Sequence, residues 1–233
     1  MPLRLLAVTF DVRDPARVAE FWAGMLGRAV VDDARGRLLP GSETQVGLRF
    51  SHTAAEKPGP NRVHLHLTST TPADQQDTVT AAVERGAAHL DVGQLPEEGH
   101  IVLADTGGNE FCVIEAGNQF LAGCGFLGEV ACDGSREVGL FWAQALGWPL
   151  VWDRDSETAV QSPHGGTKVA WGGQPQTPGQ RHDRQRFDLV AEGDPATEVD
   201  RLVSLGARRV GDGDDGSVAL ADPDGTVFTV SPR

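Results

Sequence analysis

Two histidines in a strand-like run are the clearest candidates for chemistry in this chain. Between residues 63 and 67, apolar side chains alternate with His64 and His66, so both imidazoles are expected on one face of a strand. Imidazoles near carboxylates can bind zinc, iron, manganese or nickel, or line a polar pocket without metal. Strand alternation is expected to bring further polar side chains to the same pocket face, namely Thr9, Asp11, Glu110 and Cys112.

Cys112 is a candidate nucleophile because a thiol beside a base can ionise and attack an electrophile. His64 is the base expected for it. The other reading is a small buried hydrophobe, which is the commoner role of a free cysteine.

Two acidic residues in the second half of the chain are candidates for acid–base catalysis together with His64. If Glu129 and Asp188 face one pocket, the two carboxylates can divide the acid and base roles. The alternative is that one of them pairs with Arg186 or an equivalent cation.

The tryptophans fall into two groups. Trp152 and Trp171 lie in predicted strands and are expected to form a flat apolar wall of the ligand pocket. Trp22 and Trp142 lie on the apolar stripes of predicted helices and are expected in the core. Trp148 follows a helix-ending glycine, and either role, pocket wall or core, is open for it.

These residues are set in an internal repeat. The segment 21–27 (FWAGMLG) recurs as 141–147 (FWAQALG), and 104–111 (ADTGGNEF) recurs as 221–228 (ADPDGTVF). Matches in the same order and at similar spacing indicate a duplicated chain. We predict one domain over residues 1–118 and a second over 119–233, with segment 118–124 crossing between them.

Each half divides again into two similar units. Capping residues, apolar stripes and terminal glycines predict four helices, over 14–27, 71–86, 138–147 and 194–206. Strand-like runs with one apolar face lie between them, which is typical of sheets covered by helices on one side. The fold class is therefore α+β, with a strand, a helix and several further strands repeated four times.

This order of motifs resembles the glyoxalase, bleomycin-resistance and extradiol-dioxygenase proteins, the vicinal oxygen chelate superfamily. The residues that carry the resemblance are the F-W helices ending in L-G, a later strand with histidine, and the G-N-E-F-C ending of the first half. The resemblance implies tandem glyoxalase-like domains, four βαβββ modules forming two curled mixed sheets with helices on the outer face. It also implies that the two modules of one domain form one curled sheet around a pocket.

Most metal-ligand positions of that superfamily carry other residue types here. By resemblance they fall on Ala7, Gly47 or Leu48, His64 and Cys112 in the first half. In the second half they fall on Leu127, Phe187 or Asp188, and Thr229. The family's metal site is therefore not expected, and His64 and His66 are the fallback metal ligands. A family-type dioxygenase is disfavoured because its second-domain ligands are absent.

Composition limits the partners and the compartment. The net charge of -13 disfavours nucleic acid and anionic membranes. Three cysteines without a C-x-x-C pair disfavour a disulfide framework and fit a reducing cytoplasm. The first residues are interrupted by Thr9 and Asp11 and predict a strand rather than a signal peptide.

Two functional hypotheses from different classes follow, and whether the protein is an enzyme stays open. The first is a small-molecule-binding protein of bleomycin-resistance type, without cofactor. The second is a lyase, isomerase, hydrolase or dioxygenase-like enzyme on a small oxygenated substrate. It would use a non-family metal at His64 and His66, or Glu129 and Asp188 without metal. An interaction module with closed pockets is a third reading. The two halves could pair with each other within the chain, or across a homodimer as in related proteins, and the sequence leaves this open.

Overall fold

The computed structural model describes residues 3–95, 97–173 and 184–233. The first half contains two modules, each with one helix. The first comprises β1 (Leu3–Val12), α1 (Pro15–Leu26), β2 (Val31–Asp33), β3 (Gly36–Leu39) and β4 (Gly47–His52). The second comprises β5 (Val63–Leu67), α2 (Pro72–Glu84), β6 (Ala88–His89), β7 (Ile101–Ala104) and β8 (Glu110–Val113).

The second half repeats this order. The third module comprises β9 (Leu127–Asp133), α3 (Arg136–Leu146), β10 (Leu150–Arg154), β11 (Glu157–Gln161) and β12 (Lys168–Gly172). The fourth comprises β13 (Gln185–Ala191), α4 (Pro195–Ser204), β14 (Arg208–Asp212), β15 (Val218–Ala221) and β16 (Val227–Ser231). The α+β class and the four βαβββ modules are confirmed. Within the described residues, none of the helices has the length and apolar character needed to cross a bilayer.

The predicted helices form where local capping residues place them. Asp14 caps α1 by accepting a hydrogen bond from the Arg17 amide, and Gly27 ends it in a left-handed conformation with φ of 64°. Helix α3 begins at Arg136, before the predicted position 138, because the Ser135 side chain caps it by accepting from the Val138 amide.

The strands form two eight-stranded mixed sheets, and each sheet joins one module from each half. Sheet A has the order β14-β15-β16-β13-β1-β4-β3-β2, and sheet B has the order β10-β11-β12-β9-β5-β8-β7-β6. The first strands of the modules make the junctions, because β1 pairs antiparallel with β13 and β5 pairs antiparallel with β9. The two modules of one half therefore do not share a sheet, contrary to the arrangement that the resemblance implied.

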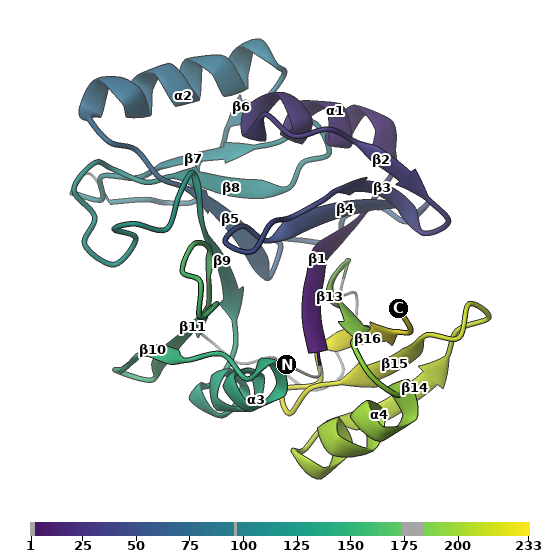
Figure 1. Cartoon of the computed structure of the whole chain (residues 1–233). Coiled ribbons are helices and arrows are strands. Elements are labelled where there is room, and N and C mark those ends of the chain that lie inside the picture. Colours follow the sequence, from purple (N-terminus) through teal and green to yellow (C-terminus); the bar gives the residue numbers. More distant parts are fainter. Residues whose placement is uncertain (1–2, 96, 174–183) are drawn as a thin grey trace.

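The hydrophobic core nevertheless links the two modules of each half. Trp22 on α1 lies 5.1 Å from Phe111 of β8, and Trp142 on α3 lies 4.9 Å from Phe228 of β16, measured between ring centroids. Figure 1 shows α1 and α2 together at one end of the molecule and α3 and α4 at the other, with β1 and β9 running between them. Trp22 and Trp142 are 1% exposed, as expected for core residues.

Each tryptophan also anchors the turn that the repeat motif encodes. The Trp22 indole donates a hydrogen bond to Asp105 (2.8 Å), and the Trp142 indole donates to Asp222 (3.2 Å). The backbone amides of Gly107 and Asn109 also donate to Asp105. The repeated A-D motifs are therefore structural, since they join a helix to the hairpin before the last strand of the next module.

Candidate functional site

In each module the first and last strands are paired, and the same position of this pairing carries polar side chains in all four modules. The register pairs Thr9 with Arg49 in the first module and His66 with Cys112 in the second. It pairs Glu129 with Lys168 in the third module and Asp188 with Thr229 in the fourth. Since the sheets join modules in pairs, each sheet carries a set of four such residues.

In sheet A this set forms a buried charge network. Asp188 accepts hydrogen bonds of 2.6 Å from both Thr9 and Thr229, and it forms ion pairs with Arg35 and Arg49. The side chains of Arg49 and Asp188 are 3% and 1% exposed. Burial opposes ionisation of Asp188, but Arg35, the threonine hydroxyls and Arg49 outweigh it and hold the pKa of this carboxyl below its ordinary value.

In sheet B the equivalent set contains a histidine–carboxylate pair. His66 Nδ1 lies 2.6 Å from Glu129 Oε2 across the β5–β9 junction. Burial disfavours the charged imidazole, but hydrogen bonds with Cys112 and Glu129, and their charges, raise the pKa of His66 to about 10. His66 is therefore an imidazolium at neutral pH, with Glu129 as its counter-ion.

A cavity of about 420 Å³ lies over sheet B beside this pair. Strand alternation turns Val130, Cys132 and Trp171 toward the core, so Ala131 and Ala170 face the opposite side and form a floor of small side chains. Trp152 on β10 and Phe120 from segment 118–124 form an aromatic wall, with ring centroids 5.4 Å apart.

The other walls of the cavity are polar. His64 and His66 line it together with Glu129, Asp133 and Glu157. Burial, and then the charge of His66, lower the pKa of His64, so its imidazole is neutral and can both donate and accept a hydrogen bond. Lys168 lies at the aromatic wall, since its ammonium donates to the Phe120 carbonyl and sits 4.2 Å from the Phe120 ring centroid.

The structure brings together only part of the predicted pocket. His64, His66, Glu129 and Trp152 line the cavity over sheet B, and Cys112 lies next to His66 in register. Trp171 borders the same cavity, but it is 3% exposed and stacks with Trp142, so it belongs mainly to the core.

Three other predicted pocket residues have different roles. Thr9 and Asp11 are on β1 in sheet A, where Thr9 bonds Asp188 and Asp11 forms an ion pair of 2.8 Å with Arg186. Glu110 is paired with Lys57 and accepts a hydrogen bond from the Asn61 amide. The placement of Thr9 and Asp11 in one pocket with the histidines was wrong because β1 and β5 belong to different sheets. Glu110 lies in sheet B, and its charge acts on His64, but it does not line the cavity.

The proposed sharing of acid and base roles between Glu129 and Asp188 was wrong for the same reason, since they lie in sheets B and A. Asp188 instead follows the alternative reading, with Arg35 and Arg49 as the main cations and Arg186 at 3.9 Å. His64 is also not the nearest base to Cys112, because His66 is its direct register partner.

Lys168 and Phe120, which meet at the aromatic wall, were not predicted as site residues. Lys168 occupies in β12 the position that Cys112 occupies in β8, and aligning the last strands of the repeats would have identified it. Phe120 comes from the crossing segment, and no local pattern indicated that this segment reaches across to Trp152.

Comparison with known proteins agrees with this architecture. A family model described as a glyoxalase-like domain matches residues 7–114 and 129–231. The chain belongs to this family of glyoxalase-like domains. The two matched regions correspond to the two halves of the repeat.

Solved structures show that the family fold extends over the whole chain. Glyoxalase I from Zea mays is 14% identical, with a TM-score of 0.68 over 98% of this chain and 92% of that one. A putative dioxygenase from Bacillus subtilis subsp. subtilis str. 168 is also 14% identical, with a TM-score of 0.62 over 98% and 84% of the two chains. No curated protein matches this glyoxalase-like chain.

The donor sets of this glyoxalase-like protein do not fit the metal that the superfamily implies. Within residues 3–95, 97–173 and 184–233, no three or more His, Cys, Asp and Glu side chains are grouped to hold an ion. In sheet A the Arg49 guanidinium already neutralises Asp188. In sheet B the His66 ring is already paired with Glu129 at 2.6 Å, and this pairing raises the pKa of His66, which opposes the neutral imidazole that a metal ligand requires.

Proposed function

We propose that this protein binds a small, flat aromatic molecule in the cavity over sheet B, without a metal cofactor. The observation that carries the proposal is the contrast between the two sheets. Equivalent positions form a closed ion-pair network in sheet A, and they border a cavity of about 420 Å³ in sheet B. This volume lies in the range of small-molecule sites.

The walls of the cavity favour a planar ligand with one or two hydroxyl groups. Ala131 and Ala170 leave room for a ring above the floor, and Trp152 and Phe120 offer aromatic faces beside it. The neutral His64 imidazole can accept a hydrogen bond from a hydroxyl group or donate one to its oxygen. A binding protein needs no more than these contacts.

The proposal is tested by measuring the binding of 2-naphthol to the purified protein by calorimetry. Ala131→Phe fills the floor of the cavity and is expected to weaken binding at least about tenfold, because the ring cannot enter. The matched control is Ala196→Phe, the same substitution at an exposed position of α4, which should leave the affinity unchanged. Equal affinities in all three proteins would contradict the proposal.

A second candidate function is proton-transfer catalysis on a bound ligand, as in a lyase or isomerase. The observation that favours it is the 2.6 Å His66–Glu129 pair at the cavity wall, which supplies an acid and its counter-ion. Solvent deuterium exchange into bound ketones, followed by NMR and lost in His66→Gln, would support this function. If a ketone binds but takes up no deuterium from the solvent, the proton-transfer function is contradicted and binding alone remains.

A further inference from the structure

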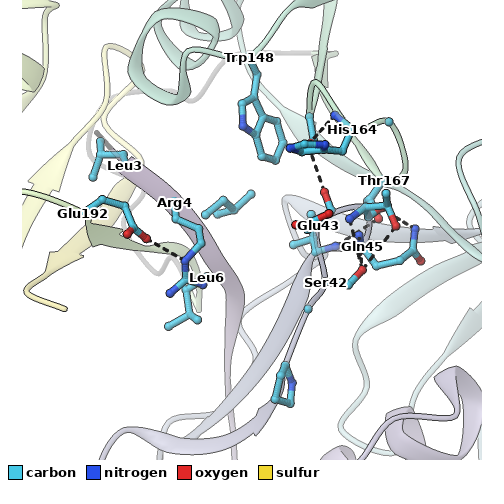
Figure 2. A pocket seen from close by; sticks show the side chains of 17 residues that line it. Leu3, Arg4, Leu6, Ser42, Glu43, Gln45, Trp148, His164, Thr167 and Glu192 are labelled. Atoms are coloured by element: carbon cyan, nitrogen blue, oxygen red, sulfur yellow. Dashed lines mark hydrogen bonds and ion pairs between the residues drawn. The ribbon is translucent and has the colours of Figure 1, made fainter. Parts of the chain in front are cut away.

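A second and larger cavity lies between the start of β1 and two loops. It measures about 560 Å³ and is enclosed by segment 40–46, segment 162–167 and the beginning of β1. Figure 2 shows Leu3, Arg4 and Glu192 on one side of this pocket and Glu43, Gln45 and His164 on the other, with the Trp148 indole near the top. We call it the loop pocket.

The two loops of the loop pocket are fastened to each other, so its shape is fixed by hydrogen bonds. The Thr167 amide donates to the Thr44 carbonyl (2.8 Å), and the Val46 amide donates to the Thr167 hydroxyl (3.3 Å). Gly166, with φ of 89°, allows this approach, since a Cβ there would lie 1.6 Å from the Thr44 oxygen. Gln45 adds a bond from its amide nitrogen to the Cys124 carbonyl (2.9 Å).

The walls of the loop pocket are mainly apolar. Leu3, Leu5, Leu6, Val46 and Trp148 contribute aliphatic and aromatic surface. A partly exposed indole beside aliphatic side chains offers a face for an apolar or cationic group.

Most polar groups of the wall are already engaged within the protein. The Ser42 hydroxyl accepts from the Gln45 amide, and the Ser162 hydroxyl donates to the Glu43 carbonyl. Arg4 forms an ion pair of 3.2 Å with Glu192. Among the described residues, the Glu43 carboxylate has no ion-pair or hydrogen-bond partner, so it is the charge left to meet a ligand.

We propose that the loop pocket is a second small-molecule site, distinct from the cavity over sheet B, and that it takes an apolar aromatic molecule bearing a single ammonium group. The ring fills the space between Trp148 and Leu6, and the ammonium pairs with Glu43. The net charge of -13 adds a long-range attraction for such a cation.

Three naphthalene probes that differ in one group test the charge preference. They are 2-(1-naphthyl)ethylamine, 2-(1-naphthyl)ethanol and 1-naphthaleneacetic acid, each titrated by calorimetry at low salt. The amine is expected to bind most tightly. Glu43→Gln should weaken amine binding about two- to fivefold, which is the range of an exposed ion pair, and leave alcohol binding unchanged. Equal binding of all three probes would overturn the charge assignment.

Two cavity-filling variants test the location. Leu6→Trp fills the loop pocket and should reduce amine affinity at least about tenfold, whereas Ala131→Phe, which fills the other cavity, should not change it. If Leu6→Trp lowers the melting temperature, Trp148→Ala is the second variant. It removes one wall of the loop pocket instead of filling it and should also weaken amine binding. Amine binding that survives both loop-pocket variants, or that is lost in Ala131→Phe, would overturn the proposal.

Discussion

At the scale of single residues, the two sheets use equivalent positions in opposite ways. Asp188 in sheet A is neutralised by Arg35 and Arg49 and bonded by Thr9 and Thr229. His66 and Glu129 in sheet B neutralise each other beside a cavity. A buried charge needs its partner in either case, and in sheet B a cavity lies next to the pair.

The pKa of His66 provides the first prediction. NMR titration of the imidazole signals should show His66 still protonated at pH 8, because Cys112 and Glu129 raise its pKa to about 10. Glu129→Gln removes the counter-ion and should move the midpoint to lower pH. His64, whose pKa is lowered, is the internal control and should titrate below the ordinary value of about 6.5.

The sign of the linkage follows from the raised pKa of His66. A histidine with a higher pKa in the folded state adds stability that is fully present below the unfolded value of about 6.5. That contribution is lost as the pH rises through about 10. A His66 signal that titrates near 6.5 in the wild type would contradict the pairing.

The second prediction concerns Asp188. Asp188→Ala removes the buried counter-ion of Arg49, whose side chain is 3% exposed, and leaves it only the partly exposed Asp33. This should lower the free energy of unfolding by about 3 kcal/mol, the lower end of the range for breaking a buried ion pair. Urea denaturation measures the loss. Asp32→Ala removes the exposed partner of Arg37 and should cause a much smaller change. Similar losses in both variants would show that the sheet A network is not a structural element.

At the scale of elements, the repeated tryptophan–aspartate anchors hold helices to hairpins, and they give the third prediction. Trp22→Phe removes the indole that donates to the buried Asp105 and should cost about 1–3 kcal/mol of unfolding free energy. Trp142→Phe, at the equivalent anchor to Asp222, should cost a similar amount.

Trp152→Phe is the matched control for the anchors, because Trp152 lies at a cavity wall and its indole donates no hydrogen bond to any residue that the structure describes. It should change the unfolding free energy much less than either anchor variant, as measured by urea denaturation. A Trp22→Phe protein as stable as Trp152→Phe would show that the anchor hydrogen bond adds little.

The elements also show what could be predicted from the sequence. Helix α1 was predicted because its signals are local, with Asp14 as cap, an apolar stripe and Gly27 at the end. The side of β5 that carries His64 and His66 was predicted because alternation is local as well. The period of the pattern and the capping chemistry were sufficient for these elements.

Which strand pairs with which could not be predicted from these local patterns. Thr9 was assigned to the pocket of His66, and Asp188 to that of Glu129, although they lie in the other sheet. Both modules of a half carry the same pattern, so either could pair with any other first strand. The choice depends on long-range contacts such as the packing of Trp22 on Phe111, which no short segment encodes.

At the scale of the whole molecule, one hydrophobic core contains residues of both halves, and both sheets are shared between the halves. The first half, residues 1–118, would leave β1 and β5 without the partners β13 and β9 if it were produced alone. We predict that this fragment is unfolded or self-associated, because β1 and β5 would keep only β4 and β8 as neighbours and would each become an exposed edge strand. Circular dichroism and analytical ultracentrifugation measure the two outcomes.

Mixing the fragment with residues 119–233 provides the control for that prediction. The two halves should form a one-to-one complex with the helix and strand content of the intact chain, because each restores the missing strand neighbours of the other. A folded, monomeric first half that does not bind the second would contradict the shared sheets.

Metal-free binding of an aromatic ligand over sheet B is the central claim, and one paired measurement tests it most directly. The affinity for 2-naphthol is measured by calorimetry before and after removal of bound metal with a chelator, and the metal content of both samples is determined. The site described here predicts the same affinity in both samples, with binding lost in Ala131→Phe. Near one mole of metal per chain, together with an affinity that disappears on chelation and returns with the ion, would contradict it.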